Sequence, residues 1–152
     1  MNTITFRKLN FDDIDTFISL RINQLREEGA KETLDLIPYL KSYYEEHLIN
    51  GTFISFIALD SNKIIGTSGI SFVCKPPYFS NPTGKIGLIS SMYTNPSYRR
   101  HGIAKTLLDK IITEAKNYGC DSIQITASSM GVPLYESYGF KKNTNFLEYN
   151  LK

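Results

Sequence analysis

The sequence predicts one mixed α/β (α+β) domain, residues 1–152, in which seven strands form a sheet flanked by about four helices. Two observations support this fold class. The chain of 152 residues is long enough for one domain with a hydrophobic core and too short for two. Short apolar runs bounded by turn residues alternate with longer stretches whose apolar residues recur at helical spacing. The predicted order is one strand, two helices, three strands, one helix, one strand, one helix and two strands.

The first half of the chain is predicted to form three strands and two helices. The runs typical of strands are residues 3–9, 53–59 and 64–73. Between the first two runs, apolar side chains at helical spacing predict two helices, which Gly29 and Gly51 are expected to end. The turn Asp60-Ser61-Asn62-Lys63 should join the second and third strands as a hairpin.

The second half adds four strands and two helices. The predicted strands are residues 85–94, 122–127, 140–141 and 146–151. A long helix is expected to begin near Ile103 and to end before Gly119, because its apolar residues recur every three or four positions. Pro133 is expected to start a short helix that ends at Gly139.

Charge and cysteine content disfavour several classes of protein. The formal net charge of +2 is too small to indicate nucleic-acid or membrane binding through bulk electrostatics. No apolar run approaches membrane-spanning length. Cys74 and Cys120 are far apart and lack the spacing of metal ligands, so we expect free thiols and no metal site. With no evident secretion signal, we expect a cytoplasmic protein that binds neither nucleic acid nor membrane.

The segment before the long helix combines several features of an anion site. The first amides of a helix lack partners and carry partial positive charge. Gly102 and Ala104 keep this surface free of bulky side chains, while Arg99, Arg100 and Lys105 add full positive charge. These features favour a pyrophosphate site. The alternative is an ordinary basic loop that caps a core helix, and the residues alone leave both open.

This segment resembles the acetyl-CoA loop of the GNAT superfamily of N-acetyltransferases. Arg99, Gly102 and Ala104 fit the Arg-x-x-Gly-x-Ala pattern of that loop, which follows a strand and a proline turn and precedes a long helix. The order of predicted elements is also similar to that family, so the resemblance covers nearly the whole chain. It implies a mostly antiparallel sheet and acetyl-CoA as cosubstrate.

The resemblance also implies which residues hold acetyl-CoA. The loop and the first helical turn would bind the pyrophosphate, and the end of the preceding strand would bind the pantetheine arm through main-chain groups. An N–H near Met92 or Tyr93 would polarise the thioester carbonyl. The predicted cofactor-binding residues are Met92, Tyr93, Thr94, Arg99, Arg100, His101, Gly102, Ile103, Ala104, Lys105 and Thr106. As an alternative, the first three would belong to an ordinary core strand.

Tyr135 is the predicted catalytic residue. Residues 132–140 look like the family pattern in which a short helix carries a tyrosine four residues before Gly-Phe. In the family that tyrosine often protonates the departing CoA thiolate. A phenol with an ordinary pKa near ~10 is protonated at neutral pH and can donate in the transition state. The alternative is a packed aromatic residue whose hydroxyl only binds CoA.

The sequence shows no evident general base. Residues 85–91 contain no carboxylate, although many members of the family carry a glutamate or histidine on this strand. Glu27 and Glu28 lie near the loop between the first two helices, where the family often binds its acceptor, and they are the predicted substrate-binding residues. A water relayed by Ser90 or Ser91 is another route for the proton, and surface glutamates are usually only solvated.

The predicted function is direct transfer of an acetyl group from acetyl-CoA to a primary amine of a small molecule or peptide, without a covalent acyl-enzyme. The alternative is a non-catalytic acyl-CoA-binding regulatory module, which the missing base would fit and which Tyr135 disfavours. The acyl chain of the donor and the identity of the acceptor are left open. Exposed sheet edges make a homodimer a reasonable expectation.

Overall fold

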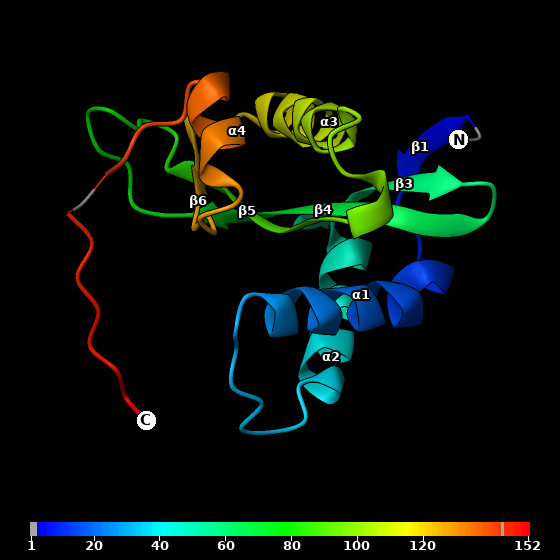
Figure 1. Cartoon of the computed structure of the whole chain (residues 1–152). Helices are drawn as coiled ribbons and strands as arrows, with labels where there is room; N and C mark the ends of the chain where they lie inside the picture. The colour runs from blue at the N-terminus through cyan, green and yellow to red at the C-terminus, as the bar shows by residue number, and fades with distance from the viewer. Residues whose placement is uncertain (1–2, 144) are drawn as a thin grey trace.

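Two pairs of helices lie on opposite faces of a central sheet in the computed structural model, which describes residues 3–143 and 145–152 (Figure 1). The strands are β1 (Ile4–Lys8), β2 (Phe53–Ile54), β3 (Phe56–Asp60), β4 (Lys63–Cys74), β5 (Lys85–Thr94) and β6 (Ser122–Ile125). The helices are α1 (Ile14–Glu27), α2 (Ile37–Asn50), α3 (Ile103–Tyr118) and α4 (Val132–Tyr138). Short 3-10 turns at Phe11–Asp13 and Pro96–Tyr98 precede α1 and α3.

The sheet is mixed and mostly antiparallel, as predicted. Its strand order is β1-β3-β4-β5-β6, and β2 also pairs with β4. Only the β5–β6 pair is parallel among the strands that the structure describes. Parallel neighbours need a crossover connection, and α3 supplies it between the end of β5 and the start of β6. This connection brings the N-terminus of α3 close to the C-terminal end of β5.

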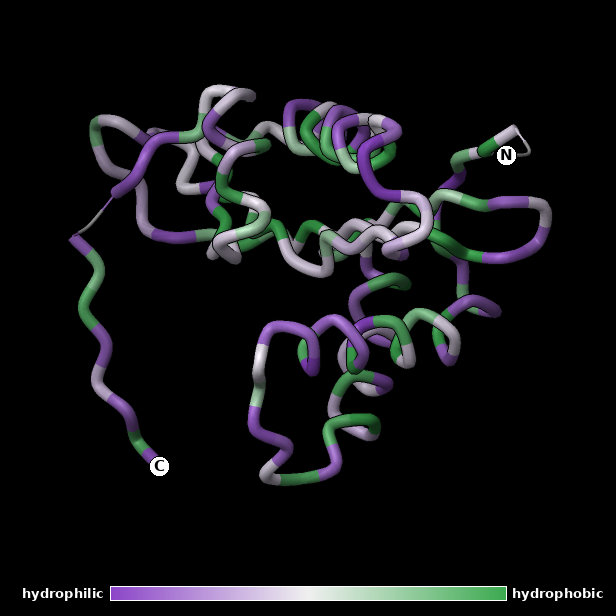
Figure 2. The backbone as a smooth tube through the Cα atoms, in the orientation of Figure 1, coloured by the Kyte–Doolittle hydropathy of each residue, from purple (hydrophilic) through white to green (hydrophobic). Residues whose placement is uncertain are grey.

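Alternation of side chains along the strands creates a hydrophobic core on each face of the sheet. Buried residues of α1 and α2 pack on one face against Ile57 and Leu59. Those of α3, with Tyr135 of α4, pack on the other face against Ile70 and Ile89. Figure 2 shows hydrophobic and hydrophilic residues alternating along α1 and α3, as expected for helices that bury one side.

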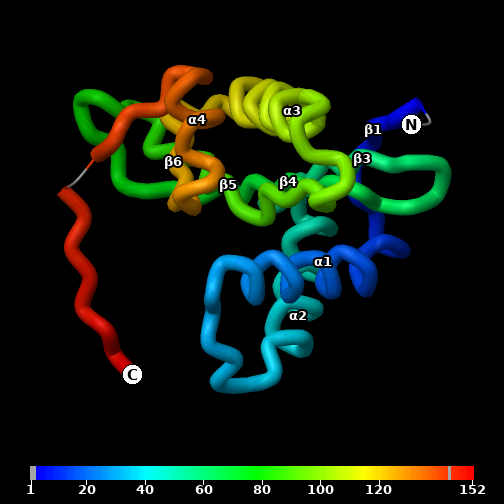
Figure 3. The backbone as a smooth tube through the Cα atoms, viewed as in Figure 1, coloured from blue at the N-terminus to red at the C-terminus, as the bar shows by residue number. Residues whose placement is uncertain are grey.

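The structure has six strands among its described residues where the sequence predicted seven. The predicted strand 53–59 is divided at Ser55 into β2 and β3, while the strands predicted at 140–141 and 146–151 are not formed. Residues 145–152 instead run away from the sheet (Figure 3). An alternating pattern forms a strand only where a neighbouring edge accepts its main-chain hydrogen bonds, and this segment has no such neighbour within the described residues.

No helix among the described residues has the length and hydrophobicity that crossing a membrane requires. Cys74 and Cys120 are both free thiols, as expected.

Candidate active site

The central feature of the site is the point where β5 and β6 part. The two strands pair from Ile86 with Ser122 to Ile89 with Ile125, and β6 ends there. β5 continues for five more residues, 90–94, of which Ser90, Tyr93 and Thr94 pair with β4 and, within the described residues, with no other strand. The edge of β5 that faces away from β4 is therefore without a strand partner over this stretch. Main-chain groups on such an edge can bind a ligand.

A bulge in β5 lies at the start of this open edge. The register between β4 and β5 shifts between Thr67 and Gly69, and Ser91 has a left-handed φ of 59°. Two side chains fix the carbonyl groups of the bulge. The Thr67 hydroxyl donates to the Ser91 carbonyl (2.7 Å), and Gln24 Nε2 of α1 donates to the Met92 carbonyl (3.0 Å). The bulge therefore has a fixed geometry although β6 does not reach it.

The register of β4 and β5 decides which main-chain groups face the open edge. Asn95 N–H donates to the Ile65 carbonyl (2.8 Å), and Thr94 and Tyr93 lie opposite the next two residues of β4. Because inward and outward residues alternate in an antiparallel pair, the main-chain groups of Tyr93 face β4 and those of Thr94 face away from it. Met92 and Tyr93 are the two residues predicted to offer an N–H to the thioester. The N–H of Tyr93 therefore faces β4 and not the open edge.

The mouth of α3 has the properties predicted for an anion site. Arg100 and Gly102 have left-handed φ angles of 65° and 77°, and no side chain caps the first turn of the helix. A Cβ at Gly102 would have no heavy atom within 4 Å, so the space above it is open. A shallow hollow of about 210 Å³ lies here, and both Thr94 of β5 and Leu134 of α4 line it. A phosphate could therefore approach the uncapped amides of the helix.

The predicted loop residues have different orientations. The Thr106 hydroxyl donates to the Gly102 carbonyl (3.0 Å), and His101 Nδ1 lies 3.1 Å from the Tyr98 carbonyl oxygen. Lys105 pairs with Asp109 (3.2 Å) on the same helix. Ile103 and Ala104 form the first helical turn. The side chains of His101, Lys105 and Thr106 thus already contact protein groups, while Arg100 and the first helical turn line the hollow.

Arg99 lines the hollow, and its guanidinium is also bonded to other protein groups. Its Nε donates to the Thr94 carbonyl (2.8 Å), and its Nη2 lies 3.2 Å from the Glu27 carboxylate. The guanidinium also lies over the Tyr93 ring (5.6 Å) and reaches the sulfur of Met130 (3.7 Å). Arg99 thus links β5, α1 and the segment before α4, and its contacts are structural in this conformation.

Tyr135 is buried in α4, with only 7% of its surface exposed. Its ring packs edge-on against Phe140 (5.8 Å between centroids), and Gly131 leaves the space that the ring occupies. Burial and, to a smaller extent, the negative charge of Glu28 raise the pKa of Tyr135 to about 12. The phenol is therefore protonated over the whole physiological range, and Glu28 at the end of α1 is near enough to influence it.

The two glutamates predicted to bind substrate have different surroundings. Glu27 pairs with Arg99, and its charge raises the pKa of Tyr93, although burial is the larger cause. Glu28 follows the last residue of α1 and acts electrostatically on Tyr135. The structure therefore gathers the end of α1, the open edge of β5, the mouth of α3 and Tyr135 of α4 into one region. Of the two carboxylates, Glu28 is the one whose charge raises the pKa of Tyr135.

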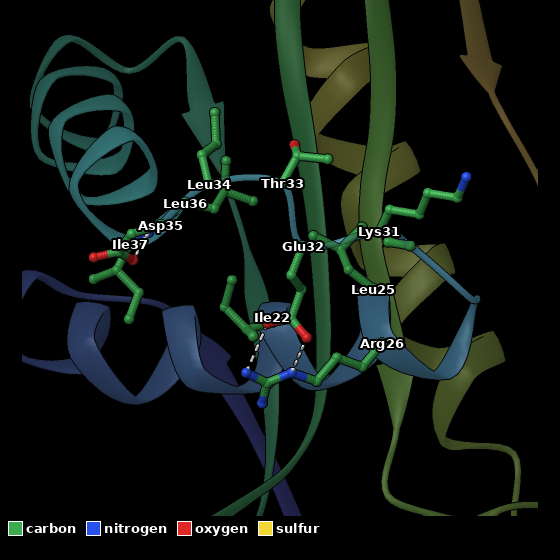
Figure 4. A pocket seen from close by; sticks show the side chains of 11 residues that line it. Ile22, Leu25, Arg26, Lys31, Glu32, Thr33, Leu34, Asp35, Leu36 and Ile37 are labelled. Atoms are coloured by element: carbon green, nitrogen blue, oxygen red, sulfur yellow. Dashed lines mark hydrogen bonds and ion pairs between the residues drawn. The ribbon is translucent and has the colours of Figure 1, made fainter.

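A second hollow, of about 300 Å³, lies between the end of α1 and the loop that leads to α2 (Figure 4). Its lining is mainly apolar. Arg26 reaches across it to Glu32 (2.8 Å), so these two charges satisfy each other (Figure 4). None of the predicted site residues lines this hollow.

Gln24 is a site residue that the sequence analysis missed. Its side chain is 9% exposed and holds the Met92 carbonyl, while Arg21 donates to its amide oxygen (2.9 Å). The sequence contains a signal of this role, because Gln24 lies seven residues after Phe17 and hence on the buried face of α1. A polar residue at a buried helical position must have a hydrogen-bond partner. The partner, 68 positions further along the chain, is visible only in the fold.

The fold and the site define an acyltransferase that takes its acyl group from a CoA thioester, and the comparisons agree with this class. Residues 18–140 match the model of the acetyltransferase (GNAT) family. A crystal structure described as a predicted acetyltransferase with acetyl-CoA, from Clostridium acetobutylicum, is 38% identical and superposes with a TM-score of 0.95 over 98% of this chain and 97% of that chain.

Curated relatives are also N-acetyltransferases. N-alpha-acetyltransferase 30 of Saccharomyces cerevisiae is 30% identical over 97% of this chain and 82% of that protein. Glucosamine 6-phosphate N-acetyltransferase of Trypanosoma brucei brucei is 24% identical, and the aligned part spans 60% of each of the two proteins. The chain belongs to the GNAT family of acetyltransferases, and its domain is that of an acetyl-CoA-dependent N-acetyltransferase.

Replacing Gln24 by leucine should destabilise the fold, because the buried carbonyl of Met92 would lose its donor. The expected loss is about 1–3 kcal/mol of unfolding free energy, measured by urea denaturation. Asn23→Leu is the matched control, since Asn23 is the exposed neighbour on the same helix. Equal midpoints for the two variants would show that the Gln24–Met92 hydrogen bond does not hold the bulge.

Glu28→Gln should lower the pKa of Tyr135 from about 12, because it removes a negative charge that opposes formation of the phenolate. The phenolate absorbance in an alkaline titration would measure this, with Tyr135→Phe identifying the signal. Glu27→Gln is the control, since the charge of Glu27 acts on Tyr93 instead. A Tyr135 titration that is the same in both variants would contradict the placement of Glu28 beside Tyr135.

Proposed function

We propose that this protein transfers an acetyl group from acetyl-CoA directly to a primary amine, with Tyr135 as the proton donor. The observation that carries the proposal is the position of Tyr135, a buried and protonated phenol in α4 whose pKa is raised by burial and, to a smaller extent, by the charge of Glu28 just after α1. The end of β5 and the mouth of α3 form one hollow beside α4. Donor, acceptor and acid can therefore meet at one place.

The residues present fit acetyl-CoA, which would supply the acetyl group as an activated thioester. The uncapped amides of residues 103–105 and the guanidinium of Arg100 suit a diphosphate. The outward main-chain groups of Thr94, with the bulge at Met92, suit the amides of the pantetheine arm. Since Gln24 and Arg99 already occupy the carbonyls of Met92 and Thr94, the edge is left mainly with N–H donors.

Tyr135 would hold a proton at its hydroxyl and donate it to the sulfur of the departing thiolate. Its raised pKa keeps that proton in place before the reaction. A positively charged nitrogen between Glu28 and Tyr135 would oppose the effect of Glu28 and make the phenol a stronger acid. Proton donation would therefore become easier when the acceptor is bound.

Glu28 is the carboxylate that we assign to the acceptor amine, since Arg99 already neutralises Glu27. It would attract the ammonium form and, directly or through water, accept the proton that the amine must lose before attack. The named relatives act on glucosamine 6-phosphate or are N-alpha-acetyltransferases, so the acceptor class proposed here is a small amine or a peptide amino group. A cytoplasmic location, favoured by the two free thiols, stays a prediction.

Tyr135→Phe should lower turnover by on the order of 100-fold or more, because it removes the proton donor but keeps the packed ring. Release of CoA in the presence of a panel of amines would measure turnover, and calorimetry with acetyl-CoA should show nearly unchanged binding. Tyr138→Phe is the control, since Tyr138 lies on the same helix and is 36% exposed. Unchanged turnover in the Tyr135 variant would remove Tyr135 as the proton donor, whereas acetyl-CoA binding without CoA release in the unmodified protein would favour the non-catalytic acyl-CoA-binding alternative.

Gly102→Glu should weaken binding of CoA by roughly tenfold or more, because the new carboxylate would lie beside the uncapped amides and repel the diphosphate. Gly51→Glu provides a close control. Gly51 has the same φ of 77°, also has nothing within 4 Å of an added Cβ, and ends α2 away from the proposed site. The two variants should lose similar stability, so a difference in CoA affinity between them would come from the site itself. Equal affinities would show that the diphosphate does not bind at the mouth of α3.

A further inference from the structure

Thr67 of β4 places a buried hydroxyl group against the bulge in β5. The residue is 3% exposed, and its hydroxyl donates to the carbonyl of Ser91 over 2.7 Å. Ser91 is 2% exposed, so this hydrogen bond is made away from bulk water. In such surroundings a hydrogen bond is electrostatically stronger than the same bond in water. The Thr67 side chain therefore fixes the direction of the Ser91 carbonyl.

The carbonyl of Ser91 and the N–H of Met92 belong to the same peptide group. Peptide bonds among the described residues are trans, and in a trans peptide the C=O and the N–H point in opposite directions. The Ser91 carbonyl is directed toward Thr67 on β4. The N–H of Met92 therefore points away from β4, toward the open edge of β5.

The strand register gives the same direction for this N–H. Main-chain groups alternate along β5, and those of Tyr93 face β4. The groups of Met92, one residue earlier, consequently face the open edge, where Gln24 binds the carbonyl. The peptide geometry and the register thus both direct the N–H of Met92 to the side on which a thioester would lie.

The orientation of this N–H depends on an unfavourable backbone conformation. Ser91 has a left-handed φ of 59°, which a residue with a Cβ adopts only at a cost. If the carbonyl lost its donor, relaxation of Ser91 would rotate the peptide group and the Met92 N–H with it. The bond from Thr67 also polarises this peptide group, which makes its N–H a stronger donor. Thr67 thus controls both the direction and the strength of the Met92 N–H.

We propose that Thr67 is a positioning residue for acetyl transfer. Its hydroxyl holds the Ser91–Met92 peptide group so that the Met92 N–H donates to the thioester oxygen of acetyl-CoA as that oxygen gains negative charge. Thr67 acts only through this peptide group, and the proposal rests on the function proposed above. Its own strand is a firm support, because β4 is paired with β3 on one side and β5 on the other.

Thr67→Val tests this role, because it keeps the shape of the side chain and removes the hydroxyl. We expect kcat to fall on the order of tenfold with little change in the KM for acetyl-CoA, since the affected interaction strengthens in the transition state. Thr67→Ser keeps the hydroxyl and should restore most of the turnover.

Ser68→Ala is the matched control for a lost buried hydroxyl. Ser68 is the next residue of β4 and is also buried, but its hydroxyl donates to the Phe56 carbonyl on β3 (2.8 Å). This variant should lose stability and keep its kcat. Equal values of kcat for Thr67→Val and Ser68→Ala would overturn the proposal.

Infrared spectroscopy separates this proposal from the proposed function, because it needs no acceptor. With acetyl-CoA isotope-labelled at the acetyl carbonyl, a hydrogen bond from Met92 should lower the stretching frequency of the bound thioester. Thr67→Val should shift that band to higher frequency, whereas Thr67→Ser and Ser68→Ala should leave it in place. If acetyl-CoA binds but no amine releases CoA, the proposed function fails, and the band still decides the role of Thr67. A band at the same frequency in the unmodified protein and in Thr67→Val, or no binding of acetyl-CoA, would contradict that role.

Discussion

The guanidinium group of Arg99 joins the segments that surround the site. It donates to the Thr94 carbonyl at the end of β5, pairs with Glu27 at the end of α1 and reaches Met130 before α4. Because an arginine has several donors in fixed directions and keeps its charge, one side chain can hold three segments at once. These segments come from both faces of the sheet, so their spacing depends on this contact as well as on the two cores. The arginine of the loop before α3 therefore also holds the end of α1 and the segment before α4.

The chemistry of the open edge of β5 depends on which of its main-chain groups already have hydrogen-bond partners. The carbonyls of Met92 and Thr94 are occupied by Gln24 and Arg99, whereas the first amides of α3 have no side-chain cap. The site therefore offers mainly donors, which match the oxygen atoms of a diphosphate, of pantetheine amides and of a thioester. This preference for ligand oxygen atoms needs no charged side chain at the reacting centre. It fits membership of the GNAT family.

Tyr135 and Glu28 reach the site from opposite layers of the fold. Tyr135 belongs to the core that α3 and α4 form on one face, and Glu28 follows α1 on the other. The charge of Glu28 raises the pKa of Tyr135 to a small extent although the two belong to opposite layers, and β5 and β6 part after Ile89. Within the described residues, β6 ends where the two strands part and is the last strand of the sheet.

Local patterns were enough to predict the mixed sheet, the long helix, the loop with Gly102 and the short helix with Tyr135, because turn residues and apolar periodicity act within a few residues. The direction of the Arg99 side chain, the role of Gln24 and the orientation of the Tyr93 backbone were decided by the tertiary structure, since each depends on a partner far away in the chain or on strand register. The segment 146–151 shows the same limit: its sequence gives it the alternation of a strand, but hydrogen bonds to a neighbouring edge, which no sequence pattern supplies, decide whether a strand forms.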